Sequence, residues 1–239
     1  MPRLRMMRAP QKYVQGKNAL LQFHNEMKDL GNKWLFICSK SGYKACHDQI
    51  EKSFEGTDDV RHYEIFGGVS SIGEIDRMRE IARKENLNVI VGVGGGSAID
   101  TAKATAHYEK LPVVIIPTVV ATDAPCTGLS VIYNNDQTFN SYLFYPKNPE
   151  AVLVDSSVIA NAPVKFLVAG MGDALGTYFE ARACERTDAP SLENGGITRS
   201  AMACKSPCSG PYSGRRARRR GARSPATRSS SSAVRRRPR

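Results

Sequence analysis

Three consecutive glycines and a serine, Gly94 to Ser97, are the residues of this sequence best suited to hold a charged ligand. They lie between a buried, β-branched stretch at 88–93 and a run rich in small residues at 97–110 that is typical of a helix. Backbone N–H groups can approach a pyrophosphate closely at glycine, and a helix N-terminus adds partial positive charge. The spacing matches neither GxGxxG nor GxxxxGK[ST]. Ser97 is expected to cap the helix, with Asp100 in its first turn. The alternative is a tight turn that needs glycine for backbone reasons alone.

A second polar segment follows the next apolar stretch, which is predicted as a buried strand at 111–117. The segment offers the hydroxyl groups of Thr118, Thr122 and Thr127 and the carboxylate of Asp123. Open parallel α/β sheets bind their ligands outside the carboxyl ends of the strands, which is where this segment is expected. An ordinary polar loop is the alternative, and composition alone does not separate the two.

The elements that must position these groups alternate between strand and helix. Helical stretches are predicted at 41–55 and 71–86, in addition to the one at 97–110. This alternation predicts an α/β fold with a mostly parallel sheet covered on both faces. The strands are expected at 33–38, 60–66, 88–93, 111–117 and 151–155, with a hairpin formed by 129–134 and 141–145.

From residue 161 onward the pattern becomes helical. Gly170 and Gly172 predict an interruption of this helix, and a new helix is expected to begin near Asp173.

Charge is distributed unevenly along the 239 residues. The formal net charge is +11, and the segment 206–239 accounts for all of it with eleven arginines and no lysine, aspartate or glutamate. This segment contains no Leu, Ile, Met or Phe, so it is expected to be disordered. The composition fits a reading-frame shift in GC-rich DNA. The competing interpretation is a basic arm that binds nucleic acid non-specifically.

Localisation signals are lacking in the sequence. The N-terminus has no apolar core like that of a signal peptide, and no apolar run approaches the length of a membrane span. The six cysteines show no CxxC pair. These features predict a reduced, cytoplasmic protein that does not associate with a membrane.

Three segments, 92–103, 117–133 and 168–184, resemble the glycerol dehydrogenases within the iron-containing alcohol dehydrogenase superfamily. The resemblance implies a dehydroquinate synthase-like α/β nucleotide-binding domain at 1–160, and only the start of an all-helical metal-binding domain at 161–203. The rest of that second domain is expected to be missing, and 204–239 to be an arginine-rich, frameshift-like tail.

The resemblance also implies an activity. Members of the family oxidise glycerol or a similar polyol to the ketone, dihydroxyacetone for glycerol, by hydride transfer to NAD at a divalent metal, typically zinc. The expected partner is a small polyol, without specific nucleic-acid or membrane binding, and the full-length form is expected to be a homo-oligomer. Same-fold enzymes that act on glycerol-1-phosphate or a 2-hydroxy acid are the alternative. Negligible activity is expected from the truncated chain itself.

Individual residues inherit roles from the matched motifs. Asp123 falls at the position that contacts the polyol, and Asp173 at the first metal ligand, with a helix N-cap as the alternative for Asp173. The NAD-binding positions of the family fall on Gly94, Gly95, Gly96, Ser97, Thr118, Thr127, Leu129 and Tyr133.

Two departures from the family pattern stand out. The family usually has an aspartate after its first strand, which hydrogen-bonds the adenosine ribose, whereas this chain has Ser39, so the preference for NAD over NADP stays open. The family also needs two histidines from the helical domain, because a catalytic zinc normally has three protein ligands. The histidines of this chain all precede Asp173 and match neither position: His24, His47, His62 and His107.

Overall fold

The computed structural model describes residues 4–190 and 195–198 of the chain. The arginine-rich tail at 204–239, for which disorder is predicted, lies outside the described residues. The last part of the segment predicted at 161–203 also lies outside them.

Six parallel strands form the central sheet, in the order β1-β8-β5-β4-β2-β3. Their bounds are β1 Lys12–Gly16, β2 Lys33–Cys38, β3 Val60–Ile65, β4 Val89–Gly94, β5 Val113–Pro117 and β8 Ala151–Asp155. A separate antiparallel pair joins β6, Leu129–Tyr133, to β7, Phe139–Phe144. The predicted α/β class, the parallel strands and the hairpin are therefore confirmed.

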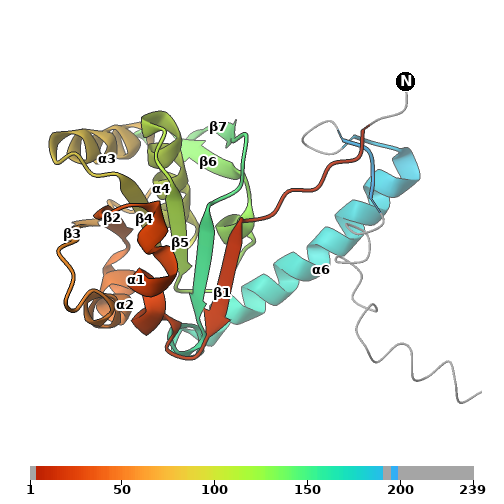
Figure 1. Ribbon diagram of the computed structural model, residues 1–239. Coiled ribbons are helices and arrows are strands. Elements are labelled where there is room, and N and C mark those ends of the chain that lie inside the picture. The colour runs from red at the N-terminus through yellow and green to blue at the C-terminus, as the bar shows by residue number, and fades with distance from the viewer. Residues whose placement is uncertain (1–3, 191–194, 199–239) are drawn as a thin grey trace, which may run out of the picture.

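Helices cover both faces of this sheet, with α1 and α2 on one face and α3 and α4 on the other (Figure 1). The helices are α1 Phe23–Met27, α2 Lys40–Ser53, α3 Ile72–Lys84, α4 Gly96–Glu109, α5 Ser156–Ala160 and α6 Val164–Thr187. Three short 3-10 helices accompany them: η1 Ala19–Gln22, η2 Lys28–Leu30 and η3 Ala124–Cys126.

Alternation of side chains along β2 explains why its sequence is apolar throughout. Trp34 and Phe36 pack on the face that α1 and α2 cover, whereas Leu35 and Ile37 pack on the face of α3 and α4. Successive side chains of a strand point to opposite faces, so a strand buried on both faces reads as a continuous apolar run.

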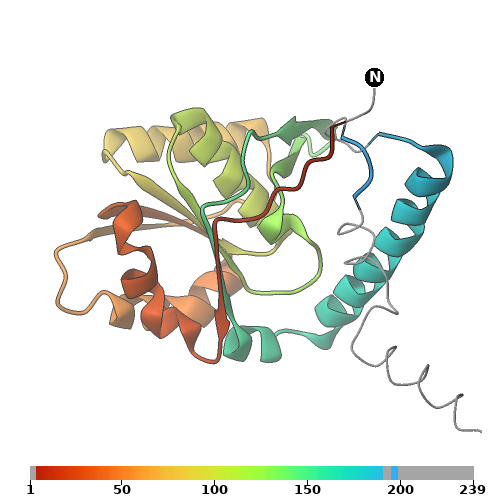
Figure 2. The same cartoon turned by 45° about the vertical axis from the view of Figure 1, so that its right-hand side comes forward.

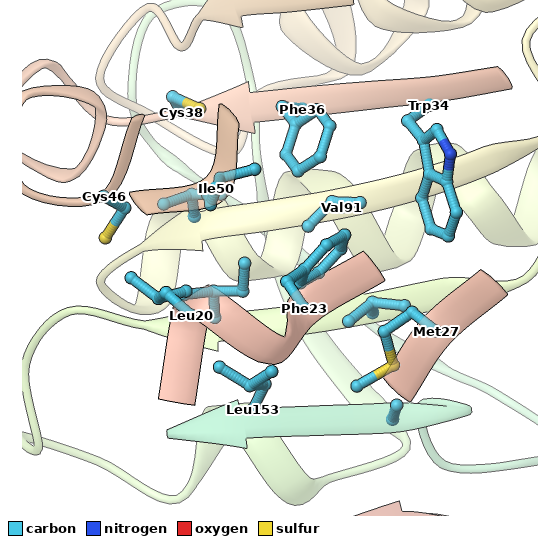
Figure 3. Packing of buried hydrophobic residues seen from close by; sticks show 14 of the residues in the cluster. Leu20, Phe23, Met27, Trp34, Phe36, Cys38, Cys46, Ile50, Val91 and Leu153 are labelled. Carbon is cyan, nitrogen blue, oxygen red and sulfur yellow. The ribbon is translucent and has the colours of Figure 1, made fainter. Parts of the chain in front are cut away.

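An aromatic cluster fills the core between α1 and the sheet. Figure 3 shows Trp34 and Phe36 pointing from β2 toward Phe23 and Met27 of α1. The ring centroids of Phe23 lie 5.5 Å from Trp34 and 5.6 Å from Phe36, at angles that suit edge-to-face and tilted packing. This cluster fixes β2 and therefore the residues that follow it at the carboxyl edge.

The elements before residue 31 were not anticipated from the sequence. Strand β1 is short and mostly exposed, and it pairs with β8 far along the chain. The Asp155 carboxylate at the end of β8 accepts hydrogen bonds from the N–H groups of Asn18 and Leu20, both at 3.1 Å. These long-range contacts, rather than a local periodicity, place the N-terminal segment.

The predicted interruption at Gly170 and Gly172 is wrong, because α6 runs continuously from Val164 to Thr187. Asp173 therefore lies in the interior of the helix and caps nothing. A glycine inside a helix costs only about 1 kcal/mol relative to alanine, which the alanine- and leucine-rich neighbours tolerate. The helix ends instead at Thr187, and the C-cap residue Asp188 adopts a left-handed conformation with φ 49°.

Helix α6 extends away from the sheet, as both views show (Figures 1 and 2), and none of its described residues is buried. Its exposed apolar side chains are those of Val164, Leu167, Val168, Met171, Leu175 and Phe179. Within residues 4–190 and 195–198, neither this helix nor another combines the length and apolarity that crossing a bilayer requires.

Candidate functional site

The glycine turn between β4 and α4 lies at the carboxyl edge of the sheet. From β2 the chain continues outward to β3, whereas from β4 it continues to β5 on the opposite side. The order of the strands thus reverses between β2 and β4, and open α/β sheets bind ligands in the crevice at such a switch point. The structure therefore places Gly94, Gly95 and Gly96 where a ligand is expected.

The N-terminus of α4 differs from the predicted cap. Gly95, not Ser97, is the N-cap residue, and no side chain hydrogen-bonds the first turn of the helix. Ser97 is the second residue of the helix and is exposed, whereas Asp100 is buried. Because the first-turn N–H groups of a helix have no partner within it, a cap without a side chain leaves them available to an anion.

The space around the glycine turn is crowded at Gly94 and open at Gly95. A Cβ atom added to Gly94 would lie 3.0 Å from both the Ser39 hydroxyl oxygen and the Ala98 Cβ. A Cβ atom added to Gly95 would meet only the Val119 side chain, at 3.5 Å. Gly94 is therefore required for packing, whereas Gly95 faces the space that a ligand would occupy.

Ser39 and Thr118 flank the glycine turn. The Ser39 side chain accepts a hydrogen bond from Gly42 N–H at 3.0 Å and caps α2. The Thr118 N–H donates to the Gly94 carbonyl at 3.0 Å. Thr118 also lines a cavity of about 410 Å³ between α2 and the start of α6, together with Gln49, whose side-chain oxygen has no hydrogen-bond partner in the described part of the chain. These contacts bring Ser39 and Thr118, both identified from the sequence, next to the glycine turn.

Asp123 and Asp173 line a single cavity of about 280 Å³, although 50 residues separate them in sequence. The close approach of α6 to the loop after β5 creates this arrangement. A Cβ atom on Gly170 would lie 1.9 Å from the Val120 carbonyl oxygen, so only glycine allows the helix to pack there. Asp173 follows Gly170 by about one turn and faces the same cavity.

Both carboxylates of this cavity are free of hydrogen bonds and ion pairs within the described residues. Asp123 is exposed at the start of η3, and Asp173 is exposed on α6. Two unpaired carboxylates that face one cavity can accept hydrogen bonds from hydroxyl groups of a ligand.

The other predicted NAD positions lie along β6 and in the loop before it. Thr127 precedes the strand, Leu129 begins it, and Tyr133 ends it. The Tyr133 N–H donates to the Ser70 carbonyl at 2.9 Å, which fixes the far end of β6 beside the segment that leads into α3. The structure therefore brings Thr127 and Leu129 together and places Tyr133 at the opposite end of the strand.

None of the four histidines lines the Asp123–Asp173 cavity. His24 lies 3.5 Å from Asp59, His47 lies 3.2 Å from Asp48, and His62 lies 2.7 Å from Glu85. The His107 ring packs on Tyr145 at a centroid distance of 5.0 Å. Across the ranges 4–190 and 195–198, no group of three His, Cys, Asp or Glu side chains could hold a metal ion. The described residues therefore do not complete a zinc site, which needs three protein ligands.

Sequence reasoning missed one charged residue beside the site. Lys103 of α4 is buried, with 1% of its side chain exposed, and contacts the loop that carries Asp123. Burial lowers the pKa of the Lys103 ammonium, and the neighbouring Asp100 carboxylate counteracts this effect. The signal in the sequence was a lysine and an aspartate three residues apart in a helical stretch rich in alanine and threonine.

Comparison with known proteins identifies the family to which this sequence is similar. Residues 10–156 match the iron-containing alcohol dehydrogenase family. The chain is 43% identical over 204 residues to glycerol dehydrogenase of Escherichia coli O6:H1, which covers 85% of this chain and 56% of that protein. It is 41% identical to glycerol dehydrogenase of Thermotoga maritima, with 81% of this chain and 53% of that protein covered.

A solved structure agrees with these matches. Glycerol dehydrogenase of Schizosaccharomyces pombe superimposes with a TM-score of 0.78 at 36% identity, covering 85% of this chain and 52% of that one. The chain thus spans about half the length of the curated relatives it matches.

Proposed function

Since this chain belongs to the iron-containing alcohol dehydrogenase family, we propose that its residues 1–160 form the nucleotide-binding domain of an NAD-dependent polyol dehydrogenase. The proposed reaction is the oxidation of glycerol to dihydroxyacetone. One observation carries the proposal: the open glycine turn and the cavity lined by Asp123 and Asp173 lie at the same edge of one sheet.

The glycine turn fits the pyrophosphate of NAD. The half-buried backbone of Gly95 and Gly96 and the uncapped first turn of α4 offer N–H groups to an anion. We assign the pyrophosphate to Gly94–Ser97 and the rest of the NAD pocket to Thr118, Thr127, Leu129 and Tyr133. When bound, NAD supplies the hydride acceptor.

Asp123 is the proposed polyol ligand, because its exposed carboxylate can accept hydrogen bonds from two vicinal hydroxyl groups. Asp173 is the proposed first ligand of a divalent metal, zinc by analogy with the glycerol dehydrogenases. The described residues contribute Asp173 alone to such a site and do not complete it.

The exposed apolar side chains of α6 favour a second packing partner for this helix. A helix without buried residues but with several exposed large apolar side chains is typical of one that packs against further structure. We propose that 161–203 begin the helical domain that completes the metal site in the longer relatives. A small polyol as substrate and a homo-oligomeric full-length form are part of the same proposal.

We expect the 239-residue chain to bind NADH but not to oxidise glycerol. NADH binding is measured by titration of the nicotinamide fluorescence, and turnover by the absorbance of NADH formed from NAD, glycerol and Zn²⁺. Turnover is expected to be undetectable, because the described residues offer Asp173 but no second and third ligand of a zinc site. NADH formation at a rate typical of a dehydrogenase would contradict this expectation.

A chimaera tests the substrate. Residues 1–187 of this chain are joined to the remaining part of the glycerol dehydrogenase of E. coli O6:H1, which is 43% identical in the shared region. The chimaera is expected to reduce NAD with glycerol. Reduction with glycerol-1-phosphate or a 2-hydroxy acid, but not with glycerol, would instead assign the chain to a sibling enzyme.

The Ser39→Asp variant is expected to shift coenzyme preference. Ser39 lies within reach of the glycine turn, and a carboxylate there repels the 2′-phosphate of NADPH and accepts hydrogen bonds from the ribose of NADH. Aspartate also caps helices well, so α2 is preserved. We expect the ratio of the NADPH to the NADH dissociation constant to rise by about tenfold or more, since one such charge interaction is worth roughly 1.4 kcal/mol.

Ser71→Asp is the matched control, because Ser71 caps α3 in the same way through Glu74 N–H. The ratio of the NADPH to the NADH dissociation constant is expected to be the same in Ser71→Asp as in the unmodified chain. An unchanged ratio in Ser39→Asp would place the adenosine ribose elsewhere.

A further inference from the structure

Helix α4 carries a buried cation in its middle, two turns beyond the proposed pyrophosphate site. Lys103 is 2% exposed as a residue, and a lysine is almost never this buried without partners. Its position is unusual because the neighbouring helix positions are alanine and threonine. A residue that is costly to bury and surrounded by small side chains calls for a physical explanation.

The partners of the Lys103 ammonium are main-chain carbonyl groups of the 122–129 loop, which runs from just before η3 to the first residue of β6. Its Nζ donates to the Ala124 carbonyl at 2.9 Å, to the Leu129 carbonyl, and more weakly to the Thr127 carbonyl at 3.4 Å. The three carbonyl groups are spread over residues 124–129, so one side chain holds this loop at three points.

Asp100 completes the attachment from the same face of α4. Its carboxylate lies 3.1 Å from the Lys103 ammonium and accepts a hydrogen bond from Val131 N–H, also at 3.1 Å. The Ser130 hydroxyl donates to the Asp100 carbonyl at 3.1 Å. Residues 124–131 are therefore fastened to α4 along their whole length, whereas the N-terminus of the same helix faces the proposed pyrophosphate.

We propose that Lys103 is a positioning residue that fixes the 122–129 loop relative to the glycine turn and thereby sets the place of the nicotinamide ring. The loop contains the proposed substrate ligand Asp123 and the proposed NAD contacts Thr127 and Leu129. The inference rests on the proposed function, which assigns those contacts. The proposed pyrophosphate site lies at the N-terminus of α4, two turns before Lys103, so the adenosine and phosphate part of the coenzyme is expected to depend less on this attachment.

The test separates these two parts of the coenzyme with two probes. ADP-ribose contains the adenosine and both phosphates but no nicotinamide, whereas NADH contains both. In the full 239-residue chain, Lys103→Met keeps the length of the side chain and removes its hydrogen-bond donors. We expect NADH binding to weaken by about tenfold or more, the equivalent of roughly one hydrogen bond to a charged group, and ADP-ribose binding to change by less than about twofold.

A spectroscopic readout accompanies the binding constants. The fluorescence of bound NADH reports the surroundings of its nicotinamide ring, and its enhancement is expected to be lost in Lys103→Met. Hydrogen exchange is expected to accelerate at the amides of 124–131, including Val131, and to stay unchanged in β4.

Thr105→Val is the matched control on the same helix. Thr105 is also fully buried, but its hydroxyl donates only to the Thr101 carbonyl within α4, at 2.8 Å. Both probes are expected to bind this variant as they bind the unmodified chain.

The inference would be overturned by an equal loss of affinity for both probes in Lys103→Met, which indicates a general scaffold role, or by no loss of affinity for either. If the unmodified chain binds neither probe, the proposed function fails instead. Hydrogen exchange then decides separately: unchanged exchange at 124–131 would show that Lys103 does not hold the loop.

Discussion

Replacing Gly95 by valine is expected to weaken NADH binding at least about 100-fold, because the side chain takes the place of the pyrophosphate at the helix N-terminus. The backbone at Gly95 is extended, with φ −91° and ψ −174°, a conformation that valine adopts readily. Its Cβ atom would meet only Val119, at an ordinary contact distance of 3.5 Å. The fold is therefore preserved, and the melting temperature is expected to change little.

The measurement is a fluorescence titration of Gly95→Val with NADH, with thermal unfolding followed in parallel. Gly16→Val is the matched control: it lies at the end of β1, and a Cβ atom there has nothing within 4 Å. The control is expected to bind NADH normally. If Gly95→Val also binds NADH normally while remaining folded, the pyrophosphate does not lie at this turn, and the proposed coenzyme site is wrong.

Phe36→Ala is expected to have the largest effect on stability, lowering the free energy of unfolding by about 3–5 kcal/mol. Phe36 is fully buried and packs against Phe23 and stacks on Tyr63 at a centroid distance of 4.6 Å. Removing its ring leaves a cavity that the packed strands around it cannot close. The loss also loosens β2, which ends next to Ser39.

Unfolding in urea is followed by the fluorescence of Trp34, the single tryptophan of the chain. Phe139→Ala serves as the comparison, because Phe139 on β7 is 54% exposed. This substitution is expected to lower the free energy of unfolding by less than about 1 kcal/mol. A midpoint of Phe36→Ala close to that of Phe139→Ala would show that the aromatic cluster does not carry the stability of the domain.

The strands from β2 onward and their approximate ends followed from sequence, because each of them carries a local physical signal. Residues 88–93 are β-branched and apolar, and strand β4 forms at Val89–Gly94. Polar residues follow the strands, so the carboxyl edge of the sheet could be recognised before the strand order was known. The resemblance of three segments to a family, which the comparison confirms at 43% identity, added the proposed roles of individual residues.

Local rules failed where a distant contact decides the conformation. The two glycines of GMGD predicted a break, yet α6 continues, and Gly170 serves instead to let the helix approach the Val120 carbonyl. The sequence does not distinguish a glycine that ends a helix from a glycine that allows close packing inside one, because the residue is the same in both cases. Only the partner element shows which of the two is present.

The sequence by itself determined the fold class and the position of the glycine turn, and its resemblance to a family supplied the residues that we propose to bind a nucleotide and a polyol. The tertiary structure decided which of them meet. It brings Asp173 into the same cavity as Asp123 across 50 residues of chain, and it buries Lys103 against the carbonyl groups of the 122–129 loop. The physical reason is that periodicity and turn chemistry act over a few residues. The desolvation of a charge and the approach of two backbones depend on segments that only folding brings together.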